Sequence, residues 1–172
     1  NTAVGYRAAY SNSTGAANTS VGNDALYGVT TGSSNTAMGY YALVRHSTGN
    51  YNVAIGTSAL EFNTTASYNT AVGYQAGYSN TTATLTTALG SQALYSNTTG
   101  EGNTAINSAL YANTTGQYNV GIGPGALSSS TTASYNVAIG GGVPSAYYAA
   151  LGLNTTGANN VAIGIGASEQ RS

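Results

Sequence analysis

The stretch Asn69-Thr70-Ala71-Val72-Gly73 decides the fold, because the chain repeats it at a fixed interval of seventeen positions. With its Asn counted as position 1, the copies start at Asn1, Asn18, Asn35, Asn52, Asn69, Thr86, Asn103, Asn119, Asn136 and Asn160. A unit of this length is too short to form a globular domain. Each copy is therefore predicted to be one coil of a stacked solenoid.

The interval breaks at two places. The copy that starts at Asn103 is one residue short, because Asn107 follows Ile106 where the other copies have Gly. The copy that starts at Asn136 is seven residues too long. The sequence thus predicts one continuous solenoid, with regular coils over residues 1–135, an enlarged coil over residues 136–159 and a partial coil over residues 160–172.

Positions 1 to 5 of each copy predict a short strand that ends in a corner. Position 4 is aliphatic in all ten copies, position 3 is Ala in eight and position 5 is Gly in nine. Because side chains alternate along a strand, we expect positions 2 and 4 to point into the coil and position 3 to point outwards. The Gly is expected where φ is positive or another backbone comes close.

The other positions complete the coil. Position 8 is Ala in nine copies and is usually followed by Leu, which predicts a second inward-facing pair. The Asn side chains at position 1 are expected to form an amide ladder between coils about 4.8 Å apart. Segments such as Asn-Thr-Thr-Gly at residues 97–100 are turn formers that bond their own backbone. The expected fold is an all-β parallel β-solenoid of about ten 17-residue coils.

The low content of charged residues excludes some classes of binding partner. Seven residues carry formal charge, and the net charge is −1. Nucleic acid and anionic membrane surfaces are not expected partners, because both require clustered Lys or Arg. No apolar run approaches the roughly 20 residues that span a bilayer, so we expect no membrane insertion by this segment. The absence of Cys leaves no disulfide and no thiolate chemistry.

A thin interior predicts self-association. Each coil supplies two or three sizeable apolar side chains, whose burial contributes on the order of 5 kcal/mol. Ordering the backbone of one residue costs about 1 to 2 kcal/mol, so a lone stack gains from burying another face. We therefore predict a homo-oligomer, with a homotrimer as the favoured assembly.

The repeats resemble those of known surface fibres. Asn-Val-Ala-Ile-Gly at Asn52, Asn136 and Asn160 resembles the head repeats of trimeric autotransporter adhesins. Residues 69–76 and 93–100 are similar to repeats of phage tail fibres. The resemblance covers essentially the whole chain and implies a left-handed parallel β-roll, association of three chains and an adhesive surface. The repeat interval of this chain is longer than the usual interval of adhesin heads and favours the fibre branch.

Ionisable groups are too sparse to predict an active site. His46 is the only His, and it occupies a different position of the repeat from Asp24 and Glu61. Nucleophilic catalysis requires a nucleophile, a base and an orienting acid within hydrogen-bond reach. One His and one Asp without Cys do not form a typical zinc site. We predict no catalytic residues, no metal and no cofactor.

Tyr residues are better candidates for a binding site than the ionisable residues, because most of the 15 Tyr residues recur at the same positions of the repeat and so form columns. Stacking between coils, packing at a chain interface and binding of sugar or protein all fit such columns, since the ring is apolar and the hydroxyl stays wet. The inserted loop at residues 141–153 is the preferred local candidate for recognition, because function tends to occupy loops on a rigid scaffold. The candidate binding residues are Tyr147, Tyr148, Tyr10, Tyr27, Tyr78, Tyr95 and Tyr111.

These features predict a non-enzymatic fibre segment, extracellular, cell-surface or virion-borne, that attaches to a cell-surface glycan or protein receptor. One alternative is a subunit of an extracellular filament, because neither end shows an evident polar cap. Another is an ice-binding solenoid, suggested by the Thr columns at positions 13 and 14. Adjacent residues of a strand point to opposite faces, so these columns are expected to give one outward rank of Thr.

Overall fold

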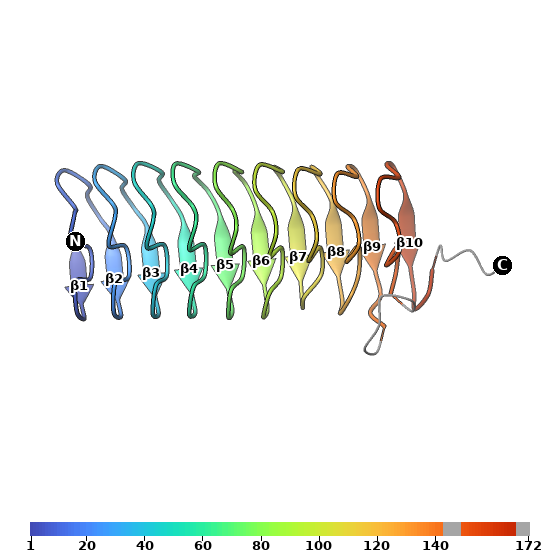
Figure 1. Ribbon diagram of the computed structural model, residues 1–172, viewed down its shortest axis with the longest axis horizontal. Helices are drawn as coiled ribbons and strands as arrows, with labels where there is room; N and C mark the ends of the chain where they lie inside the picture. Colours follow the sequence, from blue (N-terminus) through green and yellow to red (C-terminus); the bar gives the residue numbers. More distant parts are fainter. Residues whose placement is uncertain (143–148, 168–172) are drawn as a thin grey trace.

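The chain forms a parallel β-solenoid. The computed structural model describes residues 1–142 and 149–167, and the described chain is a row of coils with one short strand each (Figure 1). The strands are β1 (Thr2–Val4), β2 (Thr19–Val21), β3 (Thr36–Met38), β4 (Val53–Ile55), β5 (Thr70–Val72), β6 (Thr87–Leu89), β7 (Thr104–Ile106), β8 (Val120–Ile122), β9 (Val137–Ile139) and β10 (Val161–Ile163). They form a single ten-stranded sheet in sequence order. The predicted fold class is confirmed.

Equal positions of the repeat pair with one another along the whole sheet. Ala54 lies opposite Ala71, one repeat further along the chain, and this register recurs for most neighbouring strands. Thr104 pairs with Val120 despite the missing residue, and Val137 pairs with Val161 despite the insertion. Both irregularities fall outside the strands, so the side-chain columns of the sheet continue past them.

The predicted direction of the strand side chains is wrong. Position 3 is the buried one: Ala54 is 0% exposed, whereas Ile55 beside it is 38% exposed. The strands in the middle of the sheet repeat this pattern, with position 3 buried and positions 2 and 4 partly exposed. The interior under the sheet is narrow, and the side chains that point into it are small. Where Ser20 replaces Ala, its hydroxyl donates to the carbonyl oxygen of Ala25 at 2.7 Å.

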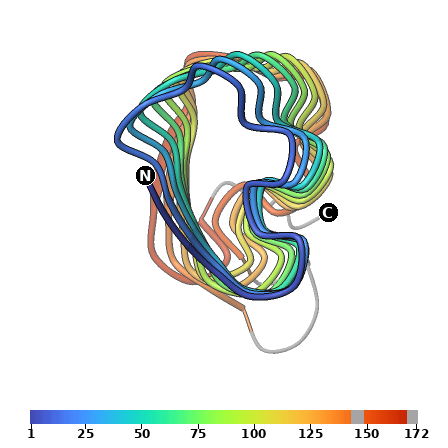
Figure 2. The ribbon, with the colours of Figure 1, turned by 90° about the vertical axis from the view of Figure 1, so that its left-hand side faces the viewer.

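The wall opposite the sheet supplies the larger core side chains, as predicted for positions 8 and 9. Viewed along the axis, this wall folds inwards between two bulges, and the strand runs straight on the other side (Figure 2). The buried Leu residues of this wall are Leu26, Leu43, Leu60, Leu94, Leu110 and Leu127. Each has a left-handed φ between 49° and 55°. That conformation costs about 1 to 2 kcal/mol per residue, and it lets two consecutive side chains both face the interior.

A column of buried Asn side chains runs through the coils, and the predicted amide ladder is confirmed. The Oδ1 atom of Asn35 accepts from the backbone N–H of Asn52 at 2.9 Å and from its Nδ2 at 3.0 Å. Nδ2 of Asn52 also donates to the carbonyl oxygen of Ala66 at 2.9 Å. Oδ1 of Asn52 in turn accepts from the backbone N–H of Asn69 at 3.0 Å, so this side chain joins its own coil to both neighbours. Thr86 continues the column by donating its hydroxyl to Oδ1 of Asn69.

The Asn-Thr-Thr-Gly turns close as predicted. Nδ2 of Asn97 donates to the carbonyl oxygen of Gly100 at 3.0 Å within the same turn. The Thr at position 13 adds a second ladder, because the hydroxyl of Thr81 donates to the carbonyl oxygen of Thr98 at 3.0 Å. These Asn residues begin Asn-Thr-Thr glycosylation sequons, but Asn80 and Asn97 are 0% exposed. The folded coil withholds these two amides from modification.

The enlarged coil leaves the common path for only part of its length. The backbone N–H of Ala150 donates to the carbonyl oxygen of Gly140 at 2.9 Å, as Ala8 does to Gly5 in the first coil. Ala150 and Leu151 then take the buried places of positions 8 and 9. The added residues therefore lie within 141–149, a shorter stretch than the predicted loop of 141–153.

Gly at position 5 satisfies both expected requirements. Gly56 has φ +130°, and a Cβ built on it would lie 2.5 Å from the carbonyl oxygen of Gly73. Gly164 has a similar φ of +118°, but a Cβ there would meet nothing within 4 Å. Both residues have the strained backbone conformation, but only Gly56 lies against the next coil. Substitutions at the two positions can therefore separate the cost of backbone strain from the cost of a clash with the next coil.

We predict that Gly56→Ala lowers the free energy of unfolding by about 3 kcal/mol or more, because it combines strain with overpacking. Gly164→Ala is the matched control and is expected to cost about 1 kcal/mol, for strain alone. Guanidinium unfolding followed by circular dichroism measures both. Equal losses in the two variants would contradict close coil contact as the reason for this Gly.

Candidate functional site

Three surface features are candidates for function, and the first is the outside of the sheet. We call the side chains at positions 2 and 4 of β1–β10 the outer sheet face. None of them is charged. Position 4 presents an unbroken aliphatic column, in which Met38 is 42% and Ile163 is 69% exposed. Because alternation along the strand predicts that these side chains point into the coil, the sequence does not reveal this face.

The second feature is the set of Tyr columns. Tyr10 stacks on Tyr27 with ring centroids 5.5 Å apart, and Tyr95 lies between Tyr78 and Tyr111 at 5.0 and 5.1 Å. Aromatic stacking at these distances stabilises neighbouring coils. Tyr10 is 69% and Tyr111 is 40% exposed, so binding by these rings stays a prediction. Tyr147 and Tyr148 lie outside the described residues.

The third feature is a groove near the N-terminal end of the solenoid, with a volume of about 290 Å³. We call it the charged groove; its lining residues are Arg7, Asp24, Tyr27, Tyr41, Val44, Arg45 and Glu61. Glu101 is the one other charged side chain within residues 1–142 and 149–167. The chain has few charges, and four of them line this groove.

The register of the repeat brings these residues together. Arg7, Asp24 and Tyr41 occupy position 7 of three successive coils. Tyr27, Val44 and Glu61 occupy position 10 on the other side of the infolded wall. Residues at position 7 are left-handed, with φ +48° at Arg7 and +55° at Asp24. The backbone turn that sends positions 8 and 9 inwards therefore leaves positions 7 and 10 on either side of a furrow.

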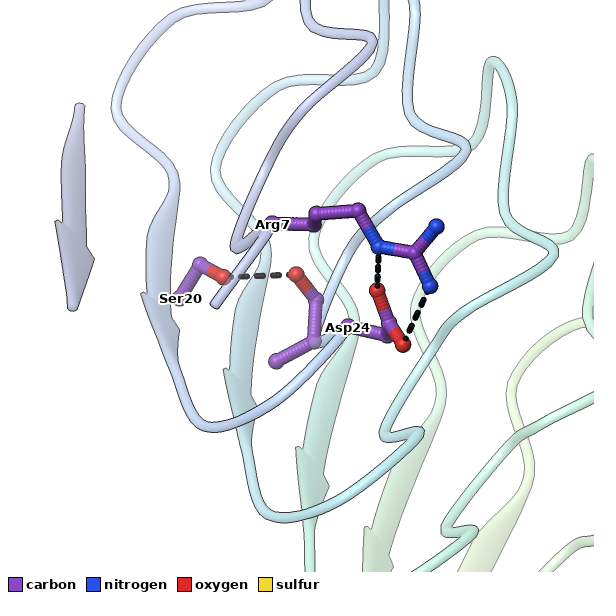
Figure 3. Close-up of polar contacts among 4 residues, drawn as sticks. Arg7, Ser20 and Asp24 are labelled. Carbon is purple, nitrogen blue, oxygen red and sulfur yellow. Dashed lines mark hydrogen bonds and ion pairs between the residues drawn. The ribbon is translucent and has the colours of Figure 1, made fainter. Parts of the chain in front are cut away.

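One end of the charged groove is fixed by an ion pair. Nε of Arg7 donates to Oδ1 of Asp24 at 2.7 Å, and its Nη2 donates to Oδ2 at 2.9 Å. Figure 3 shows this two-pronged contact between adjacent coils. The hydrogen bond to Asp24 raises the pKa of Arg7 above its usual value. The Arg7 guanidinium also lies over the rings of Tyr6 and Tyr27.

The other end holds charges without such a partner. Arg45 lies over the ring of Phe62, 4.4 Å from the centroid. Within the part of the chain that the structure describes, neither Arg45 nor Glu61 forms a salt bridge. Their side chains are thus free to bond a ligand, while Val44 and two Tyr residues add apolar lining. With two cationic and two anionic groups, the groove has no net formal charge.

His46 lies inside the coil and outside the charged groove. It takes the place of the turn Asn and is 0% exposed, with Nε2 2.8 Å from the carbonyl oxygen of Gly49. This carbonyl only accepts, so Nε2 carries the proton. Burial lowers the pKa of His46. Within residues 1–142 and 149–167, no three His, Asp or Glu side chains gather where they could share a metal ion.

Comparison of the chain with protein-family models, with curated proteins and with solved structures finds no match. The described residues contain no helix that is long and apolar enough to cross a membrane.

We predict that acid destabilises the protein through His46. The unfolded chain has the higher His pKa, about 6.5, so it takes up a proton first and stability falls as the pH drops below that value. The slope for one proton is at most about 1.4 kcal/mol per pH unit. His46→Asn restores the residue that other turns use and should remove this loss. Urea unfolding between about pH 7.5 and pH 5.5 tests this, above the range in which carboxylates titrate. The same pH dependence in wild type and variant would refute it.

Proposed function

We propose that this chain is a rod segment of a non-enzymatic attachment fibre. In this proposal the protein lies outside the cell or on a virion, assembles as a homotrimer and presents its remaining surface to a cell-surface glycan or protein. The resemblance of its repeats to adhesin heads and tail fibres supports the proposal. The observation that carries it is the uncovered outer sheet face.

The outer sheet face is an unusual surface for an isolated chain. Exposed apolar patches that are contiguous mark interaction sites in soluble proteins. This one runs from β1 to β10 with an aliphatic side chain on every strand, such as Val4, Ile55 and Ile163. A partner that covers it needs the same length and the same spacing of side chains. A second copy of the chain offers both.

Burial of this face would also offset the thin interior. The core consists mainly of Ala and Leu side chains, and fully burying one Val, Leu or Ile contributes about 1.5 to 3 kcal/mol. Covering the column at position 4 would add one such side chain per coil. Three chains around a common axis would leave the Tyr columns and the charged groove on the outside of the rod, where they can meet a receptor.

Sedimentation equilibrium tests the assembly. We expect wild type to sediment as three chains of 17.1 kDa each, with no growth at higher concentration. Ile55→Lys with Val72→Lys should yield monomers, because charges on the outer sheet face would have to be buried in the interface. Thr65→Lys with Thr82→Lys adds the same charge on an exposed turn and should leave the trimer intact. A monomeric wild type, or mass that rises without limit as in a filament, would contradict the proposal.

Ice binding is the second candidate, and the outer sheet face changes its basis. Thr side chains stand outwards at position 2 of several neighbouring strands, including Thr19, Thr36 and Thr70, beside the aliphatic column at position 4. At position 14, Thr65, Thr82 and Thr99 form the single exposed rank expected from the sequence. Regular hydroxyl and methyl ranks on a flat sheet can order water.

We expect no thermal hysteresis above that of buffer, because the trimer would cover the outer sheet face. Nanolitre osmometry of the wild-type protein checks this expectation. Ice binding would be favoured over the fibre if the wild-type protein sediments as a monomer and shows thermal hysteresis, and if this hysteresis disappears in the variant with both Ile55→Lys and Val72→Lys.

A further inference from the structure

We propose that the charged groove binds an uncharged sugar unit through Arg45 and Glu61. This inference rests on the proposed attachment function and names the class of receptor that this part of the rod would recognise. Three properties of the groove support it: its free hydrogen-bonding groups, its charge and its size.

The groove offers donors and acceptors in balance. The guanidinium of Arg45 carries N–H donors that no described carboxylate engages, and the carboxylate of Glu61 carries acceptor sites. The Arg45 guanidinium carbon lies 4.4 Å from the ring centroid of Phe62, which supports one side of this group. Neighbouring hydroxyls of a sugar both donate and accept, so one sugar can satisfy both groups at once. Charged partners make such hydrogen bonds stronger than neutral ones.

The charge of the groove argues against an anionic ligand. Asp24 takes both prongs of Arg7 at 2.7 and 2.9 Å, so Arg7 is already neutralised. Glu61 would repel a phosphate or carboxylate placed beside Arg45. A ligand of zero net charge meets no such penalty.

The remaining lining and the size suit a sugar ring. Tyr27, Tyr41 and Val44 supply apolar surface beside the polar groups, and sugars present an apolar C–H face with hydroxyls around its edge. The volume of about 290 Å³ lies just below the range of about 300 to 1,000 Å³ for small-molecule sites. It fits one or two sugar units of a longer glycan better than a folded protein surface.

The Arg7–Asp24 pair holds the site in place. It joins the first coil to the second, and the Arg7 guanidinium lies 4.9 Å from the ring centroid of Tyr27. Arg7 and Asp24 are thus positioning residues, and Arg45 and Glu61 are the residues that contact the ligand. Substitution of the second pair leaves the ion pair between the coils undisturbed.

The test uses biolayer interferometry of the whole chain against immobilised multivalent conjugates of galactose, mannose and N-acetylglucosamine, with a sialic acid conjugate as the anionic comparison. At least one neutral conjugate should bind. Arg45→Gln and Glu61→Gln should each weaken that binding about tenfold or more, as expected for loss of a charged hydrogen bond. Glu101→Gln is the matched control, because it removes a charge outside the groove and should leave binding unchanged. Thermal melts verify that each variant is folded.

The inference would be overturned if no conjugate binds or if only the sialic acid conjugate binds. It would also be overturned if the two groove variants bind a neutral conjugate like wild type, or if the chain binds a glycoprotein equally well without its sugars. The last case is tested with a glycoprotein before and after enzymatic removal of its glycans. Sedimentation of the same samples separates this inference from the proposed fibre. A trimer that binds no sugar refutes the sugar site alone, and a monomer that binds sugar refutes the assembly alone.

Discussion

The buried Asn column is the interaction on which the rest of the solenoid depends. These side chains close their own coil and bond the next one: Nδ2 of Asn69 donates to the carbonyl oxygen of Ala83 at 2.9 Å within the same coil, and its Oδ1 accepts from the N–H of Thr86 in the next coil at 2.8 Å. An amide has the donors and the acceptor that such a bridge requires. Inside a narrow coil these bonds are shielded from water, and a missing partner would leave a buried polar group unsatisfied. The column therefore fixes both the spacing and the register of the coils.

Fixed coil spacing explains the other features of the chain. The strands approach so closely that a Cβ on Gly56 would lie 2.5 Å from the backbone of the next coil, and the interior is filled mainly by Ala from the sheet and by Ala and Leu from the opposite wall. Larger aliphatic side chains are pushed to the outside, where they form the outer sheet face. Left-handed residues at positions 7 and 9 shape the infolded wall, and the same turn opens the charged groove. One geometric constraint thus produces both of the surfaces on which the proposed functions rest.

Much of this fold could be predicted from the sequence, because every coil repeats the same local physics. The constant repeat interval gives the coil, Asn at position 1 gives the ladder and Gly at position 5 gives the corner. The direction of the strand side chains could not be read from alternation alone, since Thr, Ala and Val fit either face. Arg7 and Asp24 lie one repeat interval apart, so their contact could have been predicted from the interval alone. The position of Arg45 and Glu61 beside the same groove could not, because it depends on the left-handed turn between positions 7 and 10.

The role of the Asn column in holding the coils together is tested most directly by comparing the stabilities of Asn119→Ala and Asn23→Ala. The Asn119 side chain is buried and bonds Asn103, Ala133 and Asn136, whereas Asn23 is exposed. Guanidinium unfolding should show a loss of about 3 kcal/mol for Asn119→Ala, from the buried partners left unpaired. Asn23→Ala should change stability by less than about 0.5 kcal/mol. Equal and small losses in both variants would contradict the claim that the Asn column holds the coils together.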